Sequence, residues 1–372
     1  MEWLPSKLAA SPRTVWSIET ESPGLGGVAA TSEFVIYSAR TVRDTTDNFL
    51  CARAKDGSPV WSHSYPALGS LDYGNSPRAT PLVFGNRVYV QGAMGHLGCL
   101  DLKTGEPVWE MSLKDEFEVK ETPKWGFCAS PLVVAGKLIV LPGAPDAGIA
   151  ALDPEKGKIL WKTPGIAPGY GSLVVARVKG KNQIVGHDLD SLGGWDPSTG
   201  KRLWRLAPKA PNDFNVPTPL PVEDGLIICT ENNGTRLHGF QEDGSIDPRP
   251  KASFRQLAPD THTPVIVGKR LFGVSRRLYC LVVNDLQPLG EATDPAFGRY
   301  CAIVASKDRV LVISLDGELR LFSAGGDLGR PIAKAQIFPG EKGLYSHPAF
   351  VGTRIYARGS SQLACFDLGE PG

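Results

Sequence analysis

The chain has 372 residues, including 42 Gly and 31 Pro, yet 42% of its residues are hydrophobic and only 21% are charged. This composition is typical of a folded protein with many turns and short strands, and it excludes a disordered chain or a helical bundle. Forty basic and 39 acidic residues leave a formal net charge of +1. Nucleic-acid binding selects a clustered positive surface, so we expect no nucleic-acid partner.

No stretch of the sequence has the roughly 18 uninterrupted apolar residues that a membrane span requires. The most apolar run, residues 132–141, is interrupted by Gly136 and Lys137. The sequence therefore predicts a soluble protein with no transmembrane segment. The first residues contain neither the charged start and apolar core of an export signal nor a cysteine for lipid attachment. Two expectations stay open: the protein remains in the cytoplasm, or an export signal has been removed.

The predicted elements begin with a short strand at residues 14–17 that belongs to no complete repeat. After it, four segments share a small residue, then Asp, then Gly, and finally Trp. These segments are CARAKDGSPVW (51–61), CLDLKTGEPVW (99–109), ALDPEKGKILW (151–161) and GWDPSTGKRLW (194–204). Their Trp residues follow one another at intervals of 43 to 52 residues, a period that marks propellers and solenoids.

One repeat shows how each unit folds. Residues 130–134 and 138–141 are rich in β-branched residues and predict a hairpin. A third strand ends at Asp153, whose side chain can cap a turn in which Gly157 supplies a positive φ, and a fourth strand follows. Four short antiparallel strands cannot bury both faces alone, so the units must stack on one another, and a ring leaves few exposed edges.

The opening hairpin of this unit recurs eight times along the chain. The eight occurrences are residues 28–37, 82–90, 132–140, 173–185, 220–229, 265–274, 303–313 and 349–356. The sequence thus predicts an all-β fold, an eight-bladed β-propeller of four-stranded antiparallel blades, as a single domain over residues 1–372. The last repeat ends after its third strand, at residues 363–368, so we expect the N-terminal strand to complete and close the last blade.

The repeats resemble those of the pyrroloquinoline quinone (PQQ) repeat superfamily over nearly the whole chain. These eight-bladed propellers include quinoprotein alcohol dehydrogenases and an outer-membrane assembly lipoprotein, which implies a location in the periplasm or cell envelope. The resemblance also implies that the motif Trp and Gly residues dock neighbouring blades. These residues are Trp16, Trp61, Trp109, Trp161 and Trp204, with Gly57, Gly105, Gly157 and Gly200. The later repeats, around Gly244 and Gly290, lack the motif Trp.

The resemblance to the quinoprotein enzymes is incomplete. Those enzymes use two adjacent cysteines under the cofactor and hold calcium beside a catalytic Asp, whereas no two cysteines are adjacent here. We therefore favour a binding or assembly scaffold with no cofactor. The alternatives are a PQQ-dependent oxidoreductase with calcium and a propeller enzyme that acts on a polysaccharide. No catalytic residue is assigned, and no metal site is expected because the sequence has no C-x-x-C and no closely spaced His pair.

Seven cysteines invite a redox interpretation, but their positions favour packing. Cys51 and Cys99 align with Ala151 and Gly194 of other repeats, a position that requires a small buried side chain. Cys128 and Cys301 both open first strands near the expected central channel, where a functional thiol is the alternative.

The connections that precede the first strands carry large polar and aromatic side chains and should line one mouth of the axial funnel. The candidate ligand-binding residues are Tyr73, Asn75, Arg78, Trp125, Tyr170, Asn215, His262, Tyr300, Tyr345 and His347. Convergence from distant repeats is typical of a binding pocket. Arg78 would offer a positive fork to a carboxylate and Trp125 a flat face to a ring, so we expect a small anionic or saccharide ligand, or a protein partner. The alternative is that the aromatic rings only fill the narrow end of the ring of blades.

Overall fold

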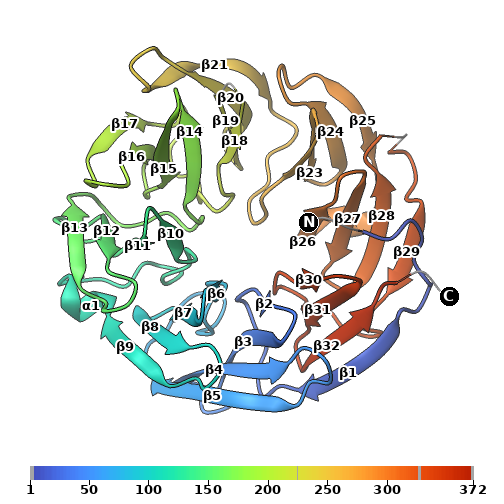
Figure 1. Cartoon of the computed structure of the whole chain (residues 1–372). Helices are drawn as coiled ribbons and strands as arrows, with labels where there is room; N and C mark the ends of the chain where they lie inside the picture. The colour runs from blue at the N-terminus through green and yellow to red at the C-terminus, as the bar shows by residue number, and fades with distance from the viewer. Residues whose placement is uncertain (1–3, 224, 326–327, 370–372) are drawn as a thin grey trace. The chain divides into compact units, whose positions relative to one another are not determined.

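The computed structural model of the chain describes residues 4–223, 225–325 and 328–369. It is an all-β eight-bladed propeller, and each blade is a sheet of four antiparallel strands (Figure 1). The predicted fold class is confirmed. The only helices of the described residues are two single turns, α1 (Leu113–Glu116) and η1 (Pro295–Gly298). Neither is long enough to cross a membrane.

The chain divides into two compact units that each contain four blades. One unit is Tyr65–Asp260, and the other combines Met1–Ser64 with Thr261–Gly372. The expectation that the chain is one domain stays a prediction.

The unit Tyr65–Asp260 contains four blades that follow one another along the chain. The first consists of β6 (Leu82–Phe84), β7 (Arg87–Gln91), β8 (His96–Asp101) and β9 (Pro107–Ser112). The second consists of β10 (Leu132–Val134), β11 (Lys137–Val140), β12 (Ile149–Leu152) and β13 (Ile159–Thr163). The third consists of β14 (Val174–Val178), β15 (Lys181–His187), β16 (Leu192–Trp195) and β17 (Arg202–Leu206). The fourth consists of β18 (Leu220–Val222), β19 (Gly225–Thr230), β20 (Gly234–Phe240) and β21 (Ile246–Phe254).

The other unit contains blades from both ends of the chain. The N-terminal blade consists of β2 (Ala29–Ala30), β3 (Phe34–Arg40), β4 (Thr46–Arg53) and β5 (Pro59–Pro66). Two later blades consist of β22 (Val265–Val267), β23 (Arg270–Val274), β24 (Leu278–Val282) and β25 (Pro288–Ala292), and of β26 (Cys301–Ala305), β27 (Arg309–Ser314), β28 (Glu318–Ser323) and β29 (Ala333–Gln336). The last combines β30 (Ala349–Val351), β31 (Arg354–Arg358) and β32 (Gln362–Asp367) with β1 (Arg13–Glu19).

The N-terminal strand completes the last blade, as predicted. Strand β1 lies at one edge of that sheet and pairs antiparallel with β32, with Thr14 opposite Phe366 and Ser17 opposite Ala364. This pairing joins the two ends of the chain by ladder hydrogen bonds and covers the edge of β32.

Local turn chemistry explains why each repeat folds into a blade. The β10–β11 hairpin turns through Ala135 and Gly136, both with positive φ, as a tight hairpin turn requires. Between β12 and β13, the carboxylate of Asp153 accepts hydrogen bonds from the backbone N–H groups of Glu155 and Lys156, at 2.9 and 3.1 Å. Gly157 then adopts a φ of +67°, as the sequence predicts.

Three motif Trp residues contact the glycine turn of a neighbouring blade within their own unit. The indole of Trp109 donates to the carbonyl of Pro154 at 2.8 Å, and a methyl group on Gly157 would lie 2.8 Å from the Trp109 ring. Trp161 donates likewise to Pro197 at 3.3 Å, and Trp16 donates to Ala54 at 3.1 Å.

Trp204 differs from the other motif Trp residues. Its indole donates to the side-chain oxygen of Gln183 at 2.7 Å, in its own blade. Gln183 in turn donates to the carbonyl of Gly244, at 3.0 Å, in the next blade. The side-chain amide of Gln183 therefore links Trp204 to the next blade. The turn at Gly244 belongs to a repeat that lacks the motif Trp.

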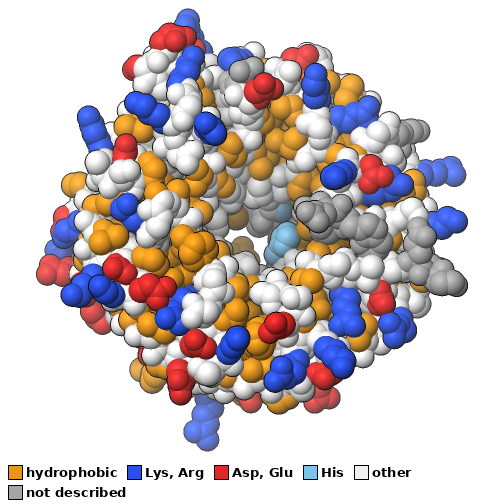
Figure 2. Space-filling model, in the orientation of Figure 1, with side chains coloured by type: hydrophobic (Ala, Val, Ile, Leu, Met, Phe, Trp, Pro, Cys, Tyr) orange, Lys and Arg blue, Asp and Glu red, His pale blue; other side chains and the backbone are white. Residues whose placement is uncertain are grey.

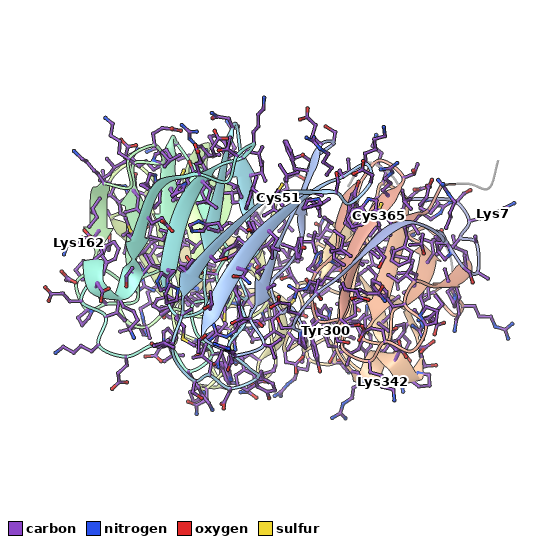
Figure 3. All side chains as sticks on the ribbon, turned by 90° about the horizontal axis from the view of Figure 1, so that it is seen from below. Lys7, Cys51, Lys162, Tyr300, Lys342 and Cys365 are labelled. Carbon is purple, nitrogen blue, oxygen red and sulfur yellow. The ribbon has the colours of Figure 1, made fainter. Side chains whose placement is uncertain are left out.

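All seven cysteines are free thiols, and six of them lie in strands. The expectation that Cys128 opens a first strand is wrong, because it lies in the connection before β10. Figure 3 labels Cys51 and Cys365 among the strands, and both side chains are buried. Burial raises the pKa of Cys51 to about 12 and that of Cys365 to about 11. These thiols therefore pack as small hydrophobic groups and are protonated at neutral pH.

Candidate functional site

Three connections in the unit Tyr65–Asp260 bring aromatic rings together. Trp125 precedes β10, Tyr170 precedes β14 and Phe214 precedes β18. The Trp125 ring meets Tyr170 edge-on with centroids 4.6 Å apart, and it meets Phe214 in the same way at 4.7 Å. Phe214 is 38% exposed, while Tyr170 is buried. We call these three residues the aromatic cluster. The ring of Phe214 is thus partly open to solvent while it packs against Trp125.

Asn215 holds two of these connections in place. Its carbonyl accepts hydrogen bonds from the backbone N–H groups of Tyr170 and Gly171, at 3.2 and 2.8 Å. Its side-chain amide donates to the carbonyls of Asp188 and Leu189, at 3.2 and 3.0 Å. The backbone of Asn215 has a φ of +52°, a conformation that Asn tolerates better than most residues. Asn215 thus holds the connections that carry Tyr170 and Phe214 in position.

Arg78 lies near Cys128 and folds onto its own connection. Its guanidinium donates to the carbonyls of Asp72, Gly74 and Ser76, at 2.8, 2.7 and 2.9 Å. Burial raises the pKa of Cys128 to about 12, and Arg78 is close enough to oppose that shift. Arg78 therefore stabilises the connection of residues 72–78.

Tyr73 and Asn75 lie in the same connection as Arg78. Tyr73 is 86% exposed and has a φ of +63°. The side chain of Asn75 accepts a hydrogen bond from the backbone of Leu71 at 2.8 Å. Asn75 therefore stabilises the connection, and Tyr73 projects from it.

The remaining four candidates lie in the other unit. Tyr300 and Tyr345 pack against each other with centroids 5.7 Å apart. The Nε2 atom of His262 accepts a hydrogen bond from the backbone of Val274 at 3.0 Å. His347 is held through its backbone carbonyl, which accepts from Val28 at 2.9 Å, and burial lowers the pKa of its imidazole. A single axial site that gathers these four with the other six stays a prediction.

A hollow of about 330 Å³ lies beside the aromatic cluster, at the connection before β18. It is formed by that connection and by the β15–β16 turn. Its lining residues are Leu189, Asp190, Ala207, Pro208, Pro211, Asn212, Asp213 and Asn215. We call it the Asp213 hollow. Of this set, only Asn215 was among the residues predicted from the sequence.

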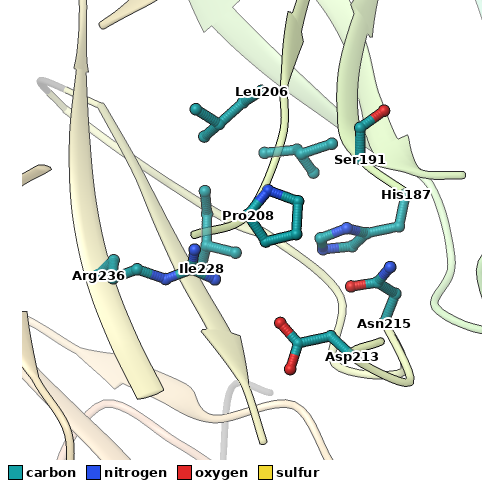
Figure 4. A pocket seen from close by; sticks show the side chains of 9 residues that line it. His187, Ser191, Leu206, Pro208, Asp213, Asn215, Ile228 and Arg236 are labelled. Atoms are coloured by element: carbon teal, nitrogen blue, oxygen red, sulfur yellow. The ribbon is translucent and has the colours of Figure 1, made fainter. Parts of the chain in front are cut away.

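A smaller cavity shares Pro208, Asp213 and Asn215 with the hollow and leads to a buried histidine (Figure 4). His187 is 4% exposed, and neither of its ring nitrogens makes a hydrogen bond, although the backbone of Ser191 lies near. Burial, with a further contribution from Arg236, lowers the pKa of His187 to about 4. The imidazole is therefore neutral at neutral pH.

Both acidic groups and the guanidinium of Arg236 lie near the hollow. Asp213 is 5% exposed and accepts hydrogen bonds from the backbone of Asn232, at 2.7 Å, and from the side chain of Asn233. Burial raises the pKa of Glu231, and the charges of Asp260 and Asp213 raise it further. Asp260 and Asp213 therefore each repel Glu231, while the positive charge of Arg236 attracts Asp213.

Away from this hollow, charge is mixed. Figure 2 shows Lys and Arg interspersed with Asp and Glu on the visible face of the blades β6–β21. In the part of the chain that the structure describes, no three His, Cys, Asp or Glu side chains group as ligands for a metal ion.

Comparison with known proteins identifies one family over most of the chain. The family model described as outer membrane protein assembly factor BamB matches residues 6–164, 67–284 and 145–371. The outer membrane protein assembly factor BamB of Shewanella oneidensis is 25% identical over an alignment 346 residues long, which covers 78% of this chain and 85% of that protein. The quinoprotein alcohol dehydrogenase PedH of Pseudomonas putida is 24% identical over an alignment 162 residues long, which covers 40% of this chain but only 25% of that enzyme.

Solved structures show the same fold. BamB from Moraxella catarrhalis superposes with a TM-score of 0.68 at 16% identity, covering 96% of this chain and 99% of that one. The quinohemoprotein alcohol dehydrogenase from Comamonas testosteroni superposes with a TM-score of 0.63 at 13% identity, covering 98% of this chain and 77% of that one. At these identities, the likeness concerns the propeller alone.

Proposed function

Because the chain belongs to the outer membrane protein assembly factor BamB family, we propose that it is a scaffold that binds a protein partner during outer-membrane protein assembly. We place the protein in the cell envelope and assign the partner site to the connections that carry the aromatic cluster. The scaffold requires no cofactor.

One observation supports this site above the others. Three successive connections, separated by about one blade each, place Tyr170 and Phe214 against the ring of Trp125, with Phe214 partly exposed. Aromatic side chains on a rigid base lose little conformational entropy on binding and are enriched among residues that dominate interface energies. Propeller loops that converge in this way can present one apolar anchor to a partner without any chemical step.

The surroundings of the cluster add polar specificity. The ammonium of Lys124 lies 5.0 Å from the Trp125 ring centroid and 3.6 Å from Asp72. A partner segment that covers Phe214 would thus meet an apolar centre with a charged rim, which is the usual arrangement of a protein interface. The comparisons give no support to a saccharide-acting enzyme.

Site-specific photo-crosslinking tests the proposal. A benzophenone amino acid replaces Phe214 in the full chain, and the matched control replaces Leu160, a residue of β13 that is 49% exposed. We expect a discrete cross-linked protein at position 214 in native cells and none at position 160. Trp125→Ala should reduce binding of that cross-linked partner at least tenfold, because it removes the ring on which Phe214 rests.

Two results would contradict the proposal. In the first, both positions give the same cross-links, which would indicate random collisions with the surface. In the second, position 214 gives none while the labelled protein is folded and present at its normal level.

A further inference from the structure

Arg358, the last residue of β31, carries a buried charge that lacks a counter-charge. Its side chain is 0% exposed, and no acidic side chain among the described residues forms an ion pair with it. Burial lowers the pKa of its guanidinium to about 10, so the group is still positive at neutral pH. Buried charges are normally paired because the protein interior solvates an isolated charge poorly. The surroundings of Arg358 therefore favour an anion.

The guanidinium of Arg358 also has hydrogen-bond donors without acceptors. Its Nη2 atom donates to the carbonyl of Ser22 at 2.7 Å. Its Nε and Nη1 atoms are buried and have no acceptor among the described residues. The ring centroid of Tyr37 lies 5.8 Å from the guanidinium carbon, and burial raises the pKa of the Tyr37 hydroxyl, which is therefore neutral. A neutral aromatic ring attracts a cation but supplies no negative charge.

The connection of residues 20–28, between β1 and β2, covers the flat face of this guanidinium. A methyl group on Gly24 would lie 2.2 Å from Nη1, 2.4 Å from the guanidinium carbon and 2.6 Å from Nε of Arg358. Because the carbon is as close as the nitrogens, Gly24 lies over the face of the group and not in the plane in which its N–H bonds point. The free N–H groups therefore point past Gly24.

A second donor without an acceptor lies in the same connection. The hydroxyl of Thr20 is buried and makes no hydrogen bond among the described residues. The backbone N–H of Thr20 donates to the carbonyl of Ser361 at 2.8 Å, which holds Thr20 beside the turn after β31. The hydroxyl of Ser22 accepts from the backbone of Arg40 at 3.0 Å, which holds the connection beside the end of β3. We call this place between β31 and β3 the Arg358 seam.

The acidic side chains of the neighbouring segments are engaged elsewhere. Glu341 accepts hydrogen bonds from the backbone and the hydroxyl of Ser360, both at 2.7 Å. Asp47 pairs with the buried Arg40 at 2.6 Å. Glu21, in the connection itself, is exposed to solvent. The charge in the seam is thus left to be balanced by an ion from solution.

We propose that the Arg358 seam binds a chloride ion, held by the guanidinium of Arg358 and the hydroxyl of Thr20. A monatomic anion accepts N–H and O–H groups from any direction, so it can use both kinds of donor. It also needs less room than an oxyanion, which suits a buried position. The bound ion would link β31 to the connection that follows β1, and it would thus stabilise the closed form of the last blade.

Line broadening of the chloride NMR signal by the full chain tests the site, because bound chloride relaxes much faster than free chloride. We expect an excess line width that saturates with chloride. Bromide should remove the excess, whereas sulfate at the same ionic strength should not. Arg358→Gln should weaken chloride binding about tenfold and Thr20→Val about threefold, because the first removes the charge and the second a donor.

The matched control is Arg277→Gln. Arg277 lies in the same unit as Arg358, but it is exposed and pairs with Glu291. Its charge is therefore compensated, and its removal should leave the excess line width unchanged.

Hydrogen exchange of the wild-type chain locates the ion without any substitution, so it also decides the question if Arg358→Gln fails to fold. Replacement of gluconate by chloride at constant ionic strength should slow exchange in peptides that contain residues 20–28 and 358–361. Equal slowing over the whole chain, or none in these peptides, would overturn the inference.

Three NMR results would also overturn it. The excess line width could fail to saturate below about 0.3 M chloride. Sulfate could remove the excess as well as bromide does, or Arg277→Gln could weaken binding as much as Arg358→Gln. None of these results bears on the cross-link at position 214, because the inference does not rest on the proposed function.

Discussion

Gly157→Ala should destabilise the protein by two separable effects. Gly157 has a φ of +67°, and the left-handed conformation costs an alanine about 1–2 kcal/mol. A methyl group there would also lie 2.8 Å from the Trp109 ring, which must shift away from its hydrogen bond with Pro154. Overpacking of this kind costs a further ~1–3 kcal/mol, so we expect a total loss of about 3 kcal/mol.

The matched control is Gly136→Ala in the same blade. Gly136 has a φ of +69°, but a methyl group there would meet no atom within 4 Å. It should therefore cost only the backbone term of about 1–2 kcal/mol. Trp109→Ala should cost about 3 kcal/mol and should also abolish the extra cost of Gly157→Ala, because the ring that the methyl meets is gone.

Urea unfolding followed by far-ultraviolet circular dichroism measures the free energy of unfolding of the three single variants and of the double variant Gly157→Ala with Trp109→Ala. This signal is chosen because it does not depend on the fluorescence of Trp109. The reasoning is refuted if Gly157→Ala costs no more than Gly136→Ala. It is equally refuted if the excess cost of Gly157→Ala persists in the Trp109→Ala background.

Three further predictions follow from the fold and from buried groups. Deletion of residues 1–18 should lower the melting temperature by several degrees and promote aggregation, because it exposes the edge of β32; a truncated protein that melts like the full chain would contradict the closure. The pKa of His187 is about 4 in the folded protein and about 6.5 in the unfolded chain, so the unfolded state binds the proton more readily. The free energy of unfolding should therefore fall by up to ~3 kcal/mol as the pH drops from 6.5 to 4. Urea unfolding at both pH values should show a smaller fall for His187→Gln, and an equal fall would refute this assignment. Native Cys51 and Cys365 should resist a thiol reagent at pH 8 and react after unfolding, as mass spectrometry can show; fast native labelling would contradict their burial.

The blades could be predicted because their signals are local. The turn from Asp153 to Gly157 needs one capping carboxylate and one glycine with positive φ, both visible within five residues of sequence. The pairing of β1 with β32 could be predicted by counting strands, because the last repeat lacked a fourth strand and the N-terminal strand belonged to no repeat.

The site could be predicted only in part because its contacts join distant residues. The placement of Trp125 and Tyr170 before first strands indicated one shared face, and the structure brings their rings together. The Asp213 hollow gave no such signal, since His187 has the position of an ordinary strand residue and meets the 208–215 connection only in the folded chain. The role of Trp204 also depended on a non-local partner, the amide of Gln183.

The central claim is that this propeller is a binding scaffold and not a quinoprotein enzyme. An absorbance spectrum and a metal analysis after incubation of the purified protein with PQQ and calcium test that claim most directly. The scaffold account predicts that the chromophore and the calcium are both removed by gel filtration. Retention of one PQQ with stoichiometric calcium per chain would contradict it.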